Sequence, residues 1–220
     1  MIHLSPARIA ATFACATLLL VTTAHATQAI VEGNTITSRE FPVGSITIDS
    51  KFSYVGTTEF VLYNVANCEI VLFAELAGKR VKRYYWLQFE GYLPDAKQTY
   101  NYSRDPKSTM IGGHAFHERA SFLNLDETRA RMRPGSDSAA VRKLFEDKGY
   151  DIGPEVMLLR MVRLDETARK ELMIIYSENL EPQGLKVADI AEGGKAFAQR
   201  DALIDGLRER AVAGIRMTMR

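Results

Sequence analysis

Cysteine and histidine are scarce in this chain of 220 residues, which contains two cysteines and four histidines. Only Cys68, His114 and His117 follow residue 26, where the leader segment described below ends. A single cysteine excludes an intramolecular disulfide, so a hydrophobic core has to stabilise the fold. A catalytic site that needs histidine has to use one of these two residues.

The common linear motifs of cofactor and nucleotide sites are also missing. The sequence has no glycine-rich phosphate loop, no GxGxxG after a strand, no GxSxG, no HExxH and no CxxC. The sequence therefore predicts no cofactor and no metal site.

Neither sign of charge is in excess. Lys and Arg total 28 and Asp and Glu total 27. Such a balance provides no long-range field for nucleic acid or for an anionic membrane surface, so neither is expected as a partner. Hydrophobic residues make up 46% of the chain and charged residues 25%, which is typical of a folded globular protein.

Residues 1–26 have the pattern of a cleaved secretory signal peptide. Arg8 is followed by an uncharged stretch that reaches its apolar peak at Leu18–Val21, and Ala24-His25-Ala26 provides a small-x-small cleavage pattern. The stretch is shorter and less apolar than the roughly 20 residues of a membrane-spanning helix. We therefore expect a periplasmic or secreted protein without stable membrane insertion after cleavage; a retained N-terminal anchor is the alternative.

The first part of the mature chain is rich in β-forming residues. Residues 27–42 show no clear period and are expected to be loosely ordered or to form a poorly held first strand. Strands are then predicted in segments rich in Val, Ile, Phe, Tyr and Thr. These segments are 43–50, 52–56, 58–65, 68–76, 80–92 and 109–123, the last with a bulge or a close backbone approach at Gly112-Gly113.

The second part adds a hairpin and helices. A helix at 137–149 is capped by Ser136 or Asp137, residues 156–164 and 172–180 form a hairpin, and helices follow at 185–192 and from 196 to about 213. Residues 124–135 are expected to be a charged loop, and Met217–Met219 a terminal tail. The prediction for 27–220 is a single α+β domain with a curved, mostly antiparallel sheet of about six to eight strands.

The strand at 80–92 carries aromatic residues on both faces. Alternation places Tyr84, Trp86, Gln88 and Glu90 on one face, which a one-sided sheet would expose to solvent. Either helices or an N-terminal strand cover this face, or it lines a pocket for a small, partly apolar molecule.

Arg160 is the charged residue that conflicts most with its surroundings, because apolar residues lie two positions before and after it on the same strand face. If that face is the core, Arg160 needs a carboxylate partner, for which Glu90 and Glu178 are the strand-borne candidates. It could tie the sheet together or bind an anionic group.

Three functions are consistent with these patterns. The first is a ligand-binding or envelope accessory protein that holds a small molecule against Tyr84, Trp86, Gln88, Glu90 and Arg160. The second is an enzyme that uses His114 or His117 as general acid or base, with Glu90 or Glu118 orienting it. The third is an envelope structural protein that contacts other chains, in one version through a Cys68 disulfide.

Overall fold

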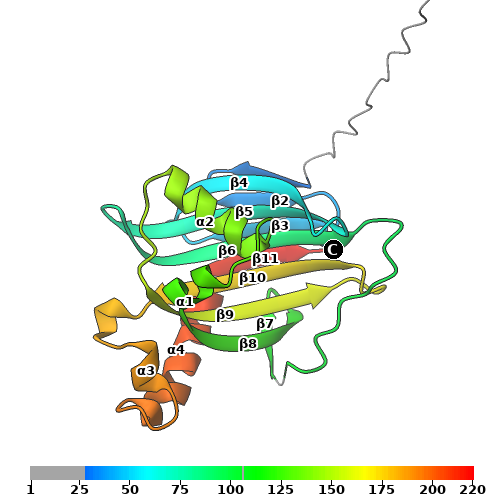
Figure 1. The fold of residues 1–220 in the computed structure, drawn as a ribbon. Helices are drawn as coiled ribbons and strands as arrows, with labels where there is room; N and C mark the ends of the chain where they lie inside the picture. Colours follow the sequence, from blue (N-terminus) through cyan, green and yellow to red (C-terminus); the bar gives the residue numbers. More distant parts are fainter. Residues whose placement is uncertain (1–27, 106) are drawn as a thin grey trace, which may run out of the picture.

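The computed structural model describes residues 28–220 except Pro106, and its largest unit is an antiparallel sheet of seven strands (Figure 1). The order across this sheet is β4-β5-β6-β10-β9-β8-β7. Its strands are β4 (Ser53–Leu62), β5 (Ala66–Ala77), β6 (Arg80–Tyr92), β7 (Lys107–Ile111), β8 (His114–Asn124), β9 (Glu155–Leu164) and β10 (Lys170–Asn179).

A smaller sheet joins the two ends of the described chain. Its order is β1-β2-β3-β11, so the last strand pairs with the third. The strands are β1 (Ala29–Glu32), β2 (Thr35–Ser38), β3 (Gly44–Ile48) and β11 (Ile215–Met219).

Four α-helices accompany the sheets in the described residues. They are α1 (Leu125–Ala130), α2 (Asp137–Asp147), α3 (Val187–Ile190) and α4 (Arg200–Ala213), with short 3-10 turns at Glu181–Gln183 and Phe197–Gln199. Helix α2 lies against β4 and β5, and α4 lies against β9 and β11 (Figure 1).

Both faces of the large sheet are buried, and β6 shows how. Tyr85, Leu87 and Phe89 point into a core that also contains residues of the small sheet and of α4. Tyr84 and Trp86 point the opposite way, into a second core with Val141 and Phe145 of α2. Both faces of this strand carry aromatic residues because the small sheet and α4 cover one face and α2 covers the other. We call the side that faces α2 the outer face.

The predicted fold class, α+β with a mostly antiparallel sheet, a mid-chain helix and a longer C-terminal helix, is confirmed. Several local predictions were wrong. The segment 27–42 was expected to be loosely ordered or to hold one poorly fixed strand, but Ala29–Glu32 and Thr35–Ser38 form the paired strands β1 and β2. Residues 125–130 form α1 instead of a loop, and the predicted tail forms β11. Residues 109–123, predicted as one strand, form β7 and β8 joined by a two-residue turn at Gly112-Gly113, whose positive φ values of 57° and 84° suit a type I′ turn. The alternative of a close backbone approach at these glycines is confirmed, because a Cβ on Gly112 would lie 2.4 Å from the carbonyl oxygen of Met217 in β11. The predicted signal peptide lies outside the described residues, so export stays a prediction.

Candidate functional site

A cavity of about 350 Å³ lies between the outer face of the large sheet and helices α1 and α2. Strands β6, β9 and β10 provide its floor, and the two helices with the segment between them provide its cover. The apolar part of its lining includes Tyr84, Trp86, Leu158, Met173, Ile175 and Phe145.

The two helices of the cover begin at well-defined caps. The Asn124 side chain accepts hydrogen bonds from the backbone N–H groups of Asp126 (3.0 Å) and Glu127 (3.2 Å). Ser136 Oγ accepts from the N–H of Ala139 at 3.2 Å. Such caps satisfy N–H groups that have no partner within the helix, so they determine where each helix starts.

Helices α1 and α2 cover the sheet in different ways. Helix α2 buries Val141 and Phe145, whose ring makes an edge contact with Tyr84 at 5.3 Å between centroids. Helix α1 buries no side chain, although Leu125, Thr128 and Arg129 line the cavity. One helix is therefore packed on the sheet, and the other stands over open space.

A chain of buried polar groups continues from the cavity along β6. Trp86 Nε1 donates to Gln88 Oε1 at 3.0 Å, Gln88 Nε2 donates to Glu90 Oε2 at 2.5 Å, and the Tyr100 hydroxyl donates to Glu90 Oε1 at 2.7 Å. Burial raises the pKa of Glu90, and the bonds from Tyr100 and Gln88 oppose that rise. Gln88 is 1% exposed and does not line the cavity, so it serves to hold Trp86 and Glu90.

Residues 93–105, here called the strap, lie over this polar end of the face. Besides Tyr100, the strap contributes Tyr102, whose hydroxyl donates to Glu171 at 2.6 Å. Arg169 fixes the strap by donating to the backbone carbonyls of Leu93, Ala96 and Gln98. The strap thereby closes the end of the outer face next to the cavity.

Arg160 lines the cavity, but its carboxylate partner differs from both predicted candidates. Its Nη2 donates to Oδ2 of Asp105 in the strap at 2.7 Å, and its guanidinium lies 5.0 Å from the centre of the Tyr102 ring. Glu90 is bound by Gln88 and Tyr100, and Glu178 is bound by Arg210. The observed partner, Asp105, lies in a loop. The alternation of residues along a strand predicts which strand residues share a face, but it does not predict which loop residue lies beside them.

Of the predicted ligand-binding residues, the structure thus brings Tyr84, Trp86 and Arg160 to one cavity and places Gln88 and Glu90 beside it. Sequence reasoning missed the contribution of α1 and of the strap. For α1 a usable pattern was present, because Asn124 precedes the acidic pair Asp126-Glu127, as is common at a helix start.

The two histidines lie away from this cavity. His114 begins β8 opposite Ile111 and is partly exposed, whereas His117 is exposed opposite Ser108. Three residues apart on a strand, they point to opposite faces. Within the described part of the chain, no hydrogen bond joins Glu90 to either histidine, and Glu118 is bound by Arg208. The enzyme hypothesis stays a prediction.

Cys68 is buried, with 3% of its surface exposed, next to Glu90 on the neighbouring strand. Burial, with the nearby Glu90, raises the pKa of its thiol. A buried, protonated thiol is a poor partner for an intermolecular disulfide, which argues against that version of the structural hypothesis.

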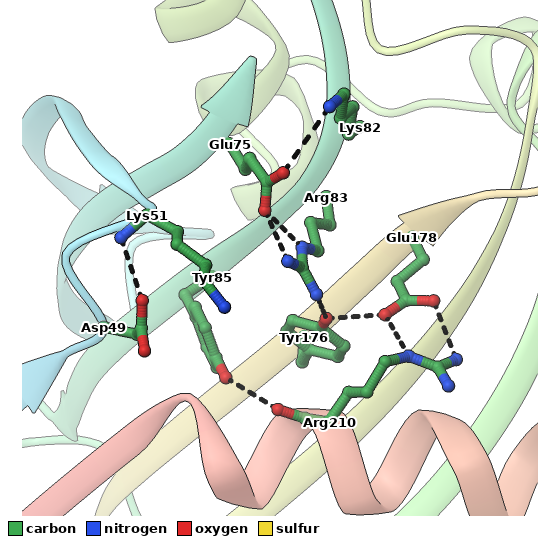
Figure 2. Close-up of polar contacts among 9 residues, drawn as sticks. All are labelled: Asp49, Lys51, Glu75, Lys82, Arg83, Tyr85, Tyr176, Glu178 and Arg210. Atoms are coloured by element: carbon green, nitrogen blue, oxygen red, sulfur yellow. Dashed lines mark hydrogen bonds and ion pairs between the residues drawn. The ribbon is translucent and has the colours of Figure 1, made fainter. Parts of the chain in front are cut away.

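A second polar cluster lies on the opposite face of the large sheet (Figure 2). Arg83 contacts Glu75 at 2.6 Å and the Tyr176 hydroxyl at 3.4 Å, Tyr176 donates to Glu178, and Arg210 of α4 donates to Glu178 at 2.7 Å (Figure 2). Each carboxylate here has an arginine partner. The cluster is therefore sufficiently explained as the attachment of α4 to the sheet.

Two negative findings concern residues 28–105 and 107–220. No group of three or more His, Cys, Asp or Glu side chains there has the arrangement of a metal site. No helix in these residues is long and apolar enough to cross a membrane.

Comparison with known protein families, with characterised proteins and with solved structures found no match for this chain.

Proposed function

We propose that this is an exported binding protein that holds a small, mostly apolar molecule in the cavity under α1 and α2. The observation that carries the proposal is α1 itself, a helix without a buried side chain that covers a cavity floored by Tyr84 and Trp86. A helix over apolar open space gains its missing contacts when a ligand fills that space. The size and lining of the cavity match those of small-molecule pockets.

The charges around the cavity indicate what kind of molecule fits. Asp126 and Arg129 on α1, and Arg142 and Glu146 on α2, place both signs at the margin. Arg160 already has Asp105 as its partner. With Asp137, Asp151 and Arg160, the lining contains four carboxylates and three arginines, so neither sign is in large excess. The proposed ligand is therefore an uncharged molecule with an apolar body and a polar group near Arg160.

Trp86 provides a direct test because it is the single tryptophan of the chain and lies in the cavity wall. We expect an uncharged apolar probe such as 1-aminoanthracene to quench Trp86 fluorescence in a saturable way. Leu158→Phe places extra atoms in the cavity and should weaken this binding at least tenfold. Met110→Phe, at a site 56% exposed on the sheet edge, is the matched control and should bind as the parent does.

Copurification provides the second measurement. Native mass spectrometry of the exported protein should show a discrete adduct that is lost in Leu158→Phe and retained in Met110→Phe. Equal probe binding by Leu158→Phe and the parent, with both proteins folded by circular dichroism, would overturn the proposal.

A further inference from the structure

Strand β4 forms one edge of the seven-stranded sheet, and within the described residues it pairs with β5 alone. Along its other side, backbone N–H and C=O groups have no strand partner. Natural edge strands are usually protected by lysine, proline, a bulge or a short length. β4 has ten residues, contains neither lysine nor proline, and carries its one bulge near the start, at Val55. Residues 56–62 are therefore a regular edge to which another strand can add.

The opposite edge of the same sheet is better protected. Strand β7 has five residues and begins with Lys107. The turn that follows β7 is also approached closely by β11, because a Cβ on Gly112 would overlap the carbonyl oxygen of Met217. Of the two edges of the large sheet, β4 is thus the long and open one.

Exposed apolar side chains collect along β4. Tyr54 near its start is 47% exposed and Val61 near its end 46%, and Tyr63 in the turn that follows is exposed as well. Beside the strand, a groove of about 390 Å³ separates it from α2, and its lining includes Phe60 and the small side chain of Ala140. Apolar side chains next to an unpaired strand edge indicate a contact surface for another chain.

The order of side chains on β4 matches a second copy of the same strand in antiparallel orientation. With Thr58 on a two-fold axis, Glu59, the single charged residue of β4, stands opposite the hydroxyl of the partner's Thr57. In the same register Phe60 stands opposite the partner's Gly56, which leaves room for the ring. A register centred on Glu59 would instead place two carboxylates in direct opposition, which is unfavourable.

The bulge extends this match to the exposed apolar residues. The pairing with β5 passes from Gly56 directly to Tyr54 and leaves out Val55, so Tyr54 occupies the next position along the edge. Tyr54 therefore comes opposite the partner's Val61, on the same face of the sheet. These two exposed side chains cover each other, and the two-fold axis repeats the contact at the other end of the strand.

We infer that β4 is a self-association surface through which two copies of this chain pair, antiparallel about a two-fold axis at Thr58, and join their large sheets into one. The pairing satisfies the open N–H and C=O groups of both edges. A second copy is the assigned partner because the apolar residues, the single charge and the glycine all find complementary positions in one register. Such an isologous contact closes after two copies and leaves no open edge there. It does not involve α1 and is independent of ligand binding.

The first test measures the oligomeric state of the purified protein by analytical ultracentrifugation, at concentrations up to about 100 μM. The parent should form a dimer. Val61→Lys places an ammonium group opposite the partner's Tyr54 and should raise the dissociation constant at least tenfold. Met110→Lys introduces the same charge at an exposed position on the opposite edge, so it is the matched control and should associate as the parent does.

Cysteine cross-linking tests the register. Thr58→Cys brings two thiols into direct opposition at the axis, so mild oxidation should give a covalent dimer. In Thr57→Cys the two thiols are offset along the strands, so this variant is the matched control and should cross-link much less. The parent should not cross-link, because its Cys68 is buried.

Three results would overturn the inference. The first is a parent that stays monomeric at the highest concentration, which would leave the edge to solvent or to a different chain. The second is equal association by Val61→Lys and the parent, with both folded by circular dichroism. The third is no covalent dimer from Thr58→Cys, or a stronger one from Thr57→Cys. If Val61→Lys does not fold, the cross-linking pair still decides, because threonine and cysteine are similar in size.

Discussion

The carboxylates of Glu90 and Glu171 occupy directly opposed positions on the neighbouring strands β6 and β10. Both residues are buried, 7% and 3% exposed, and each accepts a hydroxyl hydrogen bond from a tyrosine of the strap. Arg160, whose charge opposes the rise in the pKa of Glu171, is itself bound to Asp105. Two acids buried side by side with little positive charge favour a proton on one of them. Burial is the main cause that raises the pKa of Glu171 to about 7.

This raised pKa makes stability depend on pH in a defined direction. The ordinary value of 4.5 applies to the unfolded chain, so between pH 4.5 and 7 the folded protein binds the extra proton. Stability should therefore be greatest at the acidic end and decrease as pH rises to about 7, by up to about 3 kcal/mol from Glu171.

Glu171→Gln stays uncharged and still offers an oxygen to Tyr102, so it should flatten this dependence. Urea unfolding of the parent and the variant between pH 5 and 8 measures the effect, with the exposed Glu166→Gln as control. Parallel pH profiles for all three proteins would contradict the assignment.

The ion pair between Glu118 and Arg208 should be a major contributor to the attachment of α4. The Glu118 side chain is 2% exposed, and both its oxygens accept from Arg208, at 2.7 and 2.8 Å. Arg208→Met leaves a buried carboxylate without its cation and should cost about 3–5 kcal/mol of unfolding free energy. Adding Glu118→Gln should restore much of this loss. The exposed pair Lys143–Asp147 on α2 is the matched control, and Lys143→Met should cost less than about 1 kcal/mol.

The two glycines of the β7–β8 turn should respond differently to alanine. Both have positive φ, so alanine at either position costs about 1–2 kcal/mol of backbone strain. A Cβ on Gly113 meets no atom within 4 Å, whereas one on Gly112 would overlap the carbonyl oxygen of Met217 in β11. Gly112→Ala should therefore lower the melting temperature clearly more than Gly113→Ala. Equal effects in thermal unfolding would show that β11 does not approach this turn.

Cys68 should be unreactive in the native protein. Its burial in the outer core and its raised pKa keep the thiol protonated and inaccessible at neutral pH. Labelling with a chromogenic disulfide reagent at pH 8 should proceed only at the rate of unfolding and become immediate in 6 M guanidinium chloride. Fast stoichiometric labelling without denaturant, or a dimer on a non-reducing gel, would be the contrary result.

Local sequence patterns predicted most of the fold. Alternation and turn residues located β6 to its final residue, and the Ser136 cap with Gly149 located α2 closely. The patterns failed for β11, because five residues after a helix are too short to show a period. They also could not divide the strands between two sheets, since that division depends on contacts between residues far apart in the chain, such as Ile215 opposite Ile48.

The candidate site was predictable only where it lies on strands. Alternation placed Tyr84 and Trp86 on one face and drew attention to Arg160. The other contributors come from irregular or short segments, namely Asp105, Tyr100 and Tyr102 of the strap and Leu125 of α1. The hydrogen bonds from strap to strand join residues up to 69 positions apart, as Tyr102 and Glu171 are. No periodic pattern in the sequence encodes such a distance.

The pairing of β11 with β3 also sets an order of events for biosynthesis. Ile36 and Ile46 are buried in a core shared with Ile215 and Met217, so the first strands lack part of their cover until the final residues are available. A chain still emerging from the ribosome cannot complete the small sheet. Its early part, β1 to β3, therefore stays incompletely covered until β11 has been synthesised. Deletion of the last six residues would leave that early part permanently exposed to proteases.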